Sequence, residues 1–520
     1  MKKISITIWI ILAGVFLYTA TLWQRPLFVF EFSDWATLTE PAAQGSLLPL
    51  SRHLELFILN KAGASPFFFR IGTALLTLLS ALVLFLSGSK STLSNASRGG
   101  AMIFLLTPAI FLGGTSAAPA LQQGSLLTAA LFALFGASES KNWKSALPWG
   151  VAAAAALTGS ATLFSTPFLL LTALGTLLAF LICRSKFVPG RFSVKSLSVL
   201  LLPFVPGLFF LAQSDLGASF HLPGKTELKT LAAFIGAGTF PWIVFTPALL
   251  RNGRSRLGVL LQTPLTLFSL VLFICTLGTA LFTTGITSLA ASAAALAGMA
   301  VIWSSLMEME HLENGSCLLD RILWILAILF FLGAAAAGIW GALTLYTKIL
   351  PPALKLFTAR DAWALTALVP AVSAIWFIAG AGEKLHKERK FLALCAGTAF
   401  ALLAFHGLVP LKVVENNAPV KFLKQAVASR LPRSAEIYCD KELLTPATAV
   451  FKGRTIKKSL FPDQLETLKK AVRKKQSICV LTLSRKTSDR LPFPKTTIRS
   501  GRFTAVFYNI DFPEMYMRKP

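Results

Sequence analysis

Four carboxylates and an Arg-His pair lie in one stretch of the sequence, between the first two long apolar runs. These residues are Glu31, Asp34, Glu40, Arg52, His53 and Glu55. A carboxylate held beside a membrane can act as a general base that takes a proton from an attacking hydroxyl. The alternative is that the acids are solvated loop charges, and composition alone favours that alternative. The choice depends on the elements that hold the stretch.

This stretch, from Gln24 to about Phe67, is long for a connection between two helices. Connections of this length are usually functional or disordered. It carries several Phe and Leu residues and a Trp, which argues against disorder. Residues 52–60 have the composition of a helix lying in the membrane interface. The loop is therefore expected to be structured at the membrane surface.

Apolar runs near 20 residues dominate the rest of the chain, which is 54% hydrophobic and 14% charged. Soluble proteins carry about 25% charged residues. Runs of this length cross the hydrocarbon core as helices, because lipid cannot satisfy backbone polar groups. The first run is expected to stay as an uncleaved helix, since no clear A-x-A site follows it. The thirteen expected transmembrane spans lie at about 4–22, 68–87, 101–117, 121–137, 145–159, 162–183, 196–213, 230–250, 257–283, 285–306, 322–345, 362–381 and 391–407.

Lys and Arg are abundant in every second connection between these spans. With the N-terminus inside, the inside connections include the basic clusters at 184–195, 251–256 and 384–390, and the outside connections are poorer in basic residues. This is the positive-inside pattern of multi-pass proteins. An odd number of spans then places both the loop at 24–67 and the C-terminal end outside.

The C-terminal segment differs in composition from the rest of the chain. From residue 407 onward it holds 23 Lys and Arg against 9 Asp and Glu. This charge indicates an anionic membrane surface as a neighbour, and nucleic acid is not expected because no nucleic-acid motif accompanies it. We therefore expect a transmembrane domain over 1–407 and a small extracytoplasmic α/β domain over 408–520. Its expected helices lie at 420–430 and 461–475, and its strands at 435–439, 477–483 and 503–510.

None of the 14 acidic residues before residue 407 falls in the middle of a span. Ion-coupled pumps and transporters use such carboxylates as proton relays, and no inverted repeat is apparent. A lipid or solute transporter is therefore the least favoured interpretation. The six cysteines show no metal-binding spacing. Cys439 and Cys479 lie in expected strands of an extracytoplasmic domain, so we expect them within disulfide reach.

Several short motifs resemble the integral-membrane glycosyltransferases of the C-type fold, which include the protein mannosyltransferases and the lipid A aminoarabinose transferases. In that family the first external loop carries an Asp-Glu-Ala motif, then a Pro-Leu pair, then a Gly and an Arg that open the next span. Later motifs also match, with Leu157-Thr158 entering an apolar run and Pro241-Trp242 in a further span. The residues that match the first loop in order are Asp34, Ala36, Glu40, Pro49, Leu50, Gly63 and Arg70.

The sequence also departs from the family pattern at several charged positions. Trp35 stands where the family has the Glu of Asp-Glu-Ala, and Gly159 stands where it has a Lys. The second external Asp of the family falls near Gln122 and Gln123. These positions supply metal or phosphate ligands in the family, so their loss bears on activity and on the donor.

The resemblance implies an inverting hexosyl- or pentosyltransferase that uses a polyprenyl-phosphate sugar. Asp34 would be the general base with Glu40 as a helper, and Arg52, His53 and Arg70 would bind the donor phosphate. The implied acceptor is an envelope glycan, lipid or protein, and the implied location is a bacterial inner membrane. No cofactor is assigned, no metal ligand is named, and a divalent metal ion stays open. The alternative is a non-catalytic member of the fold that binds lipid-linked sugar or a partner.

Overall fold

A computed structural model gives the fold. It describes residues 65–88, 94–164, 167–186, 194–206, 224–246, 262–312, 317–347, 359–381, 384–408, most of 419–451, 454, 456–458, much of 470–483, 496–500 and 503–510, with a few positions before 65. The chain divides into two compact units, one built mainly from Arg70–Leu408 and the other mainly from Val409–Pro520. Parts of the segment before residue 70 belong to each unit.

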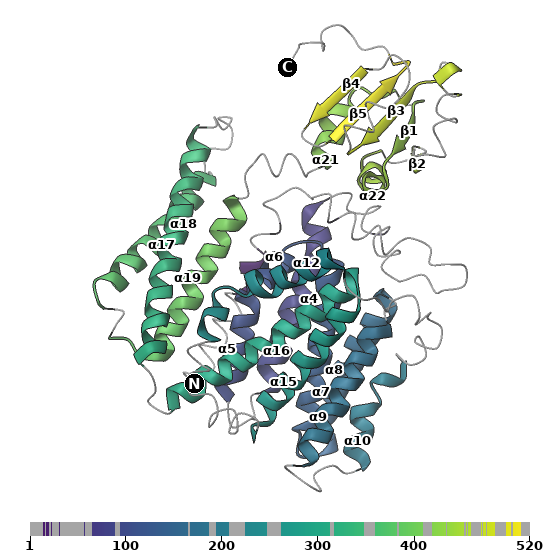
Figure 1. Cartoon of the computed structure of the whole chain (residues 1–520). Helices are drawn as coiled ribbons and strands as arrows, with labels where there is room; N and C mark the ends of the chain where they lie inside the picture. The colour runs from purple at the N-terminus through teal and green to yellow at the C-terminus, as the bar shows by residue number, and fades with distance from the viewer. Residues whose placement is uncertain are drawn as a thin grey trace. The chain divides into compact units, whose positions relative to one another are not determined.

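The first unit is a bundle of apolar helices (Figure 1). Seven of the described helices are long and apolar enough to cross a membrane, or eight when the bent pair α5–α6 counts as one span. The bundle comprises α4 (Pro66–Ser87), α5 (Ser94–Leu106), α6 (Pro108–Gly114), α7 (Pro119–Ser138), α8 (Trp143–Phe164), α9 (Pro167–Ser185), α10 (Val194–Leu201), α12 (Lys225–Gly236), the 3₁₀ turns η2 (Ala237–Thr239) and η3 (Trp242–Val244), α15 (Pro264–Phe282), α16 (Gly285–Leu312), α17 (Cys317–Thr347), α18 (Ala359–Ile378) and α19 (Lys387–Leu408). The chain is thus a multi-pass helical membrane protein, as expected.

Proline starts many of these helices. Five helices of this bundle, α4, α6, α7, α9 and α15, begin with a proline. Proline suits the first helical position because that N–H has no partner inside the helix and because its φ is already helical. The sequence therefore marks these starts, and the expected boundaries at 68, 121, 162 and 257 lie within seven residues of the observed ones.

Two expected spans are not continuous helices. The span expected at 101–117 breaks between α5 and α6, which are bent by 63°. Pro108 cannot donate a backbone hydrogen bond, and the residue before a proline favours extended backbone; Thr107 accordingly has φ −68° and ψ 121°. The span expected at 230–250 is instead α12 followed by η2 and η3, because Pro241 interrupts the helical hydrogen bonding.

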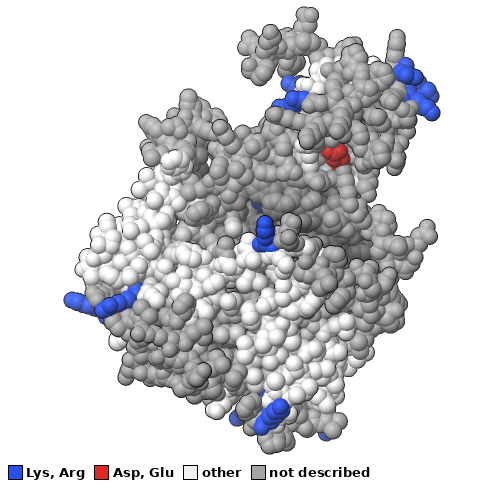
Figure 2. All heavy atoms as spheres, in the orientation of Figure 1, with Lys and Arg blue, Asp and Glu red and all other residues white. Residues whose placement is uncertain are grey.

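Helix α7 lies at the centre of the bundle, and all of its residues are buried. It packs closely on α16 (Figure 1). A Cβ added at Gly124 would lie 2.7 Å from the Ala290 carbonyl oxygen and 2.8 Å from Ala293 Cβ. Small residues of this kind let two transmembrane backbones approach each other. The visible face of the described helices is largely uncharged, with separate small groups of Lys and Arg (Figure 2).

The second unit contains a five-stranded sheet with the order β2-β1-β3-β5-β4. Strands β1, β2 and β3 are parallel, and β5 runs antiparallel to both β3 and β4. The α-helix α22 (Lys441–Val450) and the residues of α21 (Pro419–Phe422) and η5 (Leu423–Ala428) pack on one face of the sheet. The strands are β1 (Glu436–Cys439), β2 (Ile456–Lys458), β3 (Ile478–Thr482), β4 (Thr496–Ser500) and β5 (Phe503–Tyr508). The small α/β domain expected from the tail is confirmed.

The expected disulfide between Cys439 and Cys479 is wrong, because both thiols are free. Cys479 faces Ile437 across the β1–β3 ladder, and Cys439 lies two residues further along β1. A diagonal offset of this kind separates Cα atoms by roughly 8 Å, given the strand rise and spacing, which exceeds the reach of a disulfide. Burial, together with the charge of Asp440, raises the pKa of the Cys439 thiol to about 12, so the thiol is protonated at neutral pH.

Candidate functional site

Arg70 is the one predicted site residue that lies in the described part of the chain. Asp34, Glu40, Arg52 and His53 all lie outside the described residues. Arg70 stands one turn into α4, and its side chain is only 1% exposed. An arginine that anchors a helix end in the interface keeps its guanidinium in water. The burial of Arg70 therefore argues against a simple anchoring role.

A row of small polar side chains follows Arg70 along α4 and faces the start of α7. The Gln122 side-chain amide donates to Thr73 Oγ1 at 2.9 Å, and the hydroxyls of Thr77 and Ser125 lie 3.3 Å apart. Thr73 and Thr77 are four residues apart and so share one face of α4. The helices α4 and α7 are thus joined by neutral hydrogen bonds at the end where both begin.

Two further polar side chains, Tyr18 and His406, pack on Phe111 of helix α6 at the same end. The Tyr18 hydroxyl donates to the Leu105 carbonyl, beside the α5–α6 break, at 2.9 Å. The Tyr18 ring packs edge-on against the Phe111 ring, with 5.4 Å between the ring centroids. The His406 ring also packs edge-on against Phe111, with 6.0 Å between centroids. Gly114 leaves room for this arrangement, since a Cβ there would lie 2.6 Å from the Tyr18 ring. We refer to Tyr18, Arg70, Thr73, Gln122 and His406 as the outer cluster.

Every member of the outer cluster comes from a helix end that the charge pattern assigns to the outside. Arg70 was predicted as a site residue and Gln122 was noted from the sequence, whereas Tyr18, Thr73 and His406 were not predicted. The spacing of Thr73 from Arg70 on one helix was a weak signal for Thr73. The positions of Tyr18 and His406 near the ends of two expected spans, 4–22 and 391–407, were the corresponding signal for those two residues.

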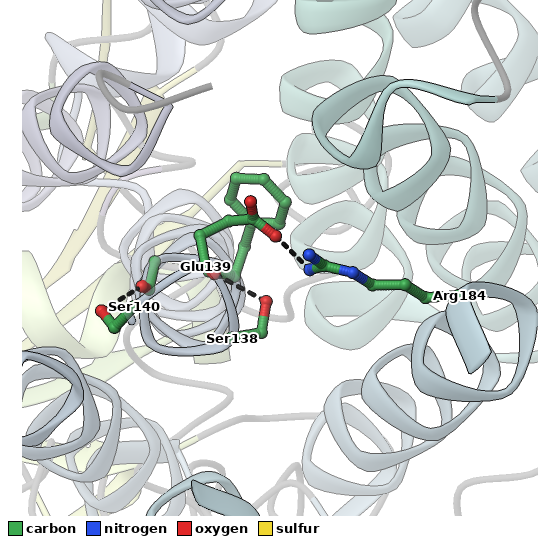
Figure 3. A network of polar contacts seen from close by, with 6 residues as sticks. Ser138, Glu139, Ser140 and Arg184 are labelled. Carbon is green, nitrogen blue, oxygen red and sulfur yellow. Dashed lines mark hydrogen bonds and ion pairs between the residues drawn. The ribbon is translucent and has the colours of Figure 1, made fainter. Parts of the chain in front are cut away.

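The opposite helix ends are joined by two ion pairs. Arg184, in the last turn of α9, is paired with Glu139 at the end of α7 (Figure 3). Lys390, in the first turn of α19, donates to Asp320 of α17 at 2.8 Å. The charge pattern assigns all four residues to the inside, and the structure pairs inside residues with inside residues. The alternation of the spans is therefore consistent with the packing at both ends.

We expect the Glu139–Arg184 pair to stabilise the bundle. The Arg184 side chain is 2% exposed and that of Glu139 14%. Removing one partner of a buried ion pair leaves the other charge without its counter-charge, so Glu139→Gln should lower the free energy of unfolding by about 3 kcal/mol. Lys141→Gln changes a neighbouring exposed residue and is the matched control. Thermal unfolding in detergent measures both variants, and equal stability of Glu139→Gln and Lys141→Gln would contradict this role.

The described residues do not offer a metal site. No group of three or more His, Cys, Asp or Glu side chains is placed to hold an ion in the described part of the chain. At the outer cluster, the second external Asp of the family pattern falls near Gln122 and Gln123, and the Gln122 amide donates to the Thr73 hydroxyl. The described members of the outer cluster include no carboxylate, and a neutral amide oxygen is a weaker ligand for a hard divalent cation than a carboxylate is.

Similarity to known proteins is seen in structure and not in sequence. No protein-family model matches the sequence, and no curated protein sequence matches it. The crystal structure of ArnT from Cupriavidus metallidurans in the apo state is similar, with a TM-score of 0.64, 13% identity, and coverage of 97% of this chain and 98% of that one. The same protein bound to undecaprenyl phosphate is also similar, with a TM-score of 0.62, 13% identity, and coverage of 96% and 98%. The likeness confirms the expected fold, that of the C-type integral-membrane glycosyltransferases.

Proposed function

We propose that the chain transfers a sugar from a polyprenyl-phosphate donor to an envelope acceptor on the extracytoplasmic side of a bacterial inner membrane. The single observation that carries the proposal is the likeness over almost the whole chain to a protein that binds undecaprenyl phosphate. The buried Arg70 at the outer cluster adds to it, because a guanidinium held out of water suits a phosphate ligand.

The reaction would be a single displacement with inversion. The acceptor hydroxyl gives its proton to the Asp34 carboxylate while its oxygen attacks the anomeric carbon. The bond from that carbon to the phosphate oxygen breaks, and polyprenyl phosphate leaves with the bonding electrons. Glu40 would assist at the base. The lipid donor would enter the site laterally from the membrane.

Arg70, with Arg52 and His53, would stabilise the charge that develops on the leaving phosphate. Fixed donors aimed at a developing negative charge are among the largest contributions to catalysis. Buried among apolar helices, the Arg70 guanidinium acts in a low dielectric, where its attraction for an anion is stronger than in water. No step in this scheme requires a metal ion.

A second function is favoured by the neutral bond between Gln122 and Thr73. With Trp35 in place of one family carboxylate, and Gln122 and Gln123 near the place of another, the chain would bind a lipid-linked sugar, or a partner enzyme, without catalysing transfer. Purified protein in lipid nanodiscs, offered a range of polyprenyl-phosphate sugars with envelope glycan acceptors, separates the two functions. Release of polyprenyl phosphate supports transfer, and saturable lipid binding without release supports the non-catalytic function. Neither binding nor release would overturn both.

The proposed side of the reaction requires the C-terminal domain to lie outside the cytoplasm. A reporter enzyme that is active only outside the cytoplasm, fused after residue 520, should be active because the positive-inside pattern and the odd span count agree. A cytoplasmic reporter fused at the same point should be silent. The reverse pair of results would show that the orientation is wrong.

A further inference from the structure

Two exposed lysines, Lys144 and Lys195, lie in the first turns of α8 and α10, at the bundle end that the charge pattern assigns to the inside. Both helices begin at this end (Figure 1). Lys141 and Lys186 are also exposed there, since each follows by two residues a partner of the Glu139–Arg184 pair that joins the ends of α7 and α9. We refer to Lys144 and Lys195 as the lysine pair.

The positive charge at this end is not balanced by acidic residues close to it in the sequence. Glu139 is the only acidic residue from position 56 to position 214, and its carboxylate is already paired with Arg184. Among the residues that the structure describes, none forms an ion pair with the lysine pair. The two ammonium groups are therefore exposed without a counter-charge from the described part of the chain.

Close packing of α8 and α10 brings the lysine pair together. A Cβ added at Gly150 of α8 would lie 2.9 Å from Val199 Cγ1 and 3.2 Å from the Val199 carbonyl oxygen of α10. Lys144 lies six residues before Gly150, and Lys195 lies four residues before Val199. At the helical rise of 1.5 Å per residue, the two lysines are about 9 and 6 Å from this contact along their helices. They therefore lie at nearly the same depth on neighbouring helices.

Apolar side chains continue from each lysine along the exposed side of its helix. On α8, Leu147 and Val151 follow Lys144 by three and seven residues and are 43% and 61% exposed. At the end of α10, Leu202 follows Lys195 by seven residues and is 63% exposed. Residues with these spacings share one face of a helix. Each helix thus presents a positive charge at its start and an apolar row beyond it.

This combination of charge and apolar surface selects the class of ligand. Trp143, 45% exposed beside Lys144, is typical of the membrane interface, which is the level of phospholipid headgroups. Free phosphate would contact only the lysines and leave the apolar rows unused. A zwitterionic phospholipid would bring its own positive charge to the lysine pair. An anionic phospholipid complements both the charge and the apolar rows.

We propose that the lysine pair binds the headgroup of an anionic phospholipid whose acyl chains lie along α8 and α10. The lipid bridges Lys144 and Lys195 and so holds α10, which has only eight residues, against α8. Basic groups between transmembrane helices select anionic headgroups in this way. The proposal does not depend on glycosyl transfer, and the lysine pair lies at the helix ends opposite to Arg70.

The first test titrates phosphatidylglycerol into the full-length protein in neutral detergent, with native mass spectrometry to count bound lipids. A basic residue near an anionic headgroup contributes about fivefold in affinity. The variant Lys144→Gln/Lys195→Gln should therefore weaken binding of the first phosphatidylglycerol by about 25-fold. The variant Lys144→Arg/Lys195→Arg keeps both charges and should bind like wild type. Phosphatidylcholine should bind more weakly than phosphatidylglycerol.

The matched control is Lys384→Gln/Arg389→Gln. Both residues are exposed and lie at the start of α19, and the charge pattern assigns them to the same side. This variant removes the same amount of charge from a different pair of positions. It should therefore leave the affinity for the first phosphatidylglycerol unchanged.

The second test measures the bridge between the helices by hydrogen exchange of the α10 backbone in lipid nanodiscs. Phosphatidylglycerol added to phosphatidylcholine nanodiscs should slow exchange over residues 194–201 in wild type. It should not slow exchange there in Lys144→Gln/Lys195→Gln. Inorganic phosphate added to nanodiscs of phosphatidylcholine alone should have no effect on α10.

Phosphatidylglycerol binding that is lost in Lys144→Gln/Lys195→Gln and kept in the arginine variant and the control supports the site. Equal affinity in wild type and the glutamine variant, or an equal loss in the control, overturns it. Slower α10 exchange with inorganic phosphate alone overturns it in favour of a soluble anion. If the glutamine variant weakens undecaprenyl phosphate but not phosphatidylglycerol, the surface belongs to the polyprenyl lipid and the proposal falls.

Discussion

Asp34→Asn is expected to lower the turnover of sugar transfer by about 10²–10⁴-fold, the usual contribution of a positioned general base. Asparagine has the shape of aspartate but cannot take the proton of the acceptor hydroxyl, so the chemical step loses its base. The affinity for the lipid donor should change little, because Asp34 is assigned to the acceptor hydroxyl. Release of polyprenyl phosphate over time, measured at saturating donor, gives the turnover.

Glu55→Gln is the matched control for this variant. Glu55 lies in the same loop and carries the same charge, but the resemblance gives it no role. Turnover close to wild type in Glu55→Gln and lost in Asp34→Asn identifies Asp34 as the base. Equal turnover in wild type and Asp34→Asn would show that the base lies elsewhere, and equal loss in both variants would indicate a general effect of loop charge.

Helix starts could be predicted from the sequence because they have a local signal, and the side of each connection has a local signal as well. Proline at the first position marks the beginning of α7 and α15, and clusters of Lys and Arg predict which connections lie inside. The ion pairs Glu139–Arg184 and Asp320–Lys390 join residues of one predicted side. Such signals depend on a few neighbouring residues and need no knowledge of the tertiary fold.

Features that depend on contacts between distant segments could not be predicted. The hydropathy of residues 101–117 is continuous across Pro108, so a single span was expected where α5 and α6 bend. The disulfide expectation failed because strand composition does not fix register, and the observed register sets Cys439 and Cys479 diagonally. Tyr18 and His406 meet through Phe111 although they lie almost 400 residues apart, and no short motif encodes that contact.

The burial of Arg70 is the feature of the outer cluster with the largest expected effect on donor binding. A hydrogen bond to a charged group contributes about 1.5–3 kcal/mol, so Arg70→Ala should raise the Kd for undecaprenyl phosphate by about 10- to 150-fold. Arg70→Lys keeps the charge but loses the planar pair of donors, and its Kd should fall between those of Arg70→Ala and wild type. Titration of the lipid into protein in detergent micelles measures these constants.

A purely structural role for Arg70 predicts a different pattern, because the residue is buried and its removal can weaken the fold. A bound ligand raises the unfolding temperature in proportion to the logarithm of its concentration over its Kd. A phosphate-binding Arg70 therefore predicts that undecaprenyl phosphate stabilises wild type, stabilises Arg70→Lys less, and leaves Arg70→Ala almost unchanged. Arg98→Gln is the matched control, since Arg98 lies near the start of α5, where it contacts Asn95 and the Phe85 ring, and the charge pattern assigns it to the inside. A variant Arg70→Ala that unfolds at a lower temperature but gains the full wild-type stabilisation from the lipid would assign Arg70 to the fold and not to the donor.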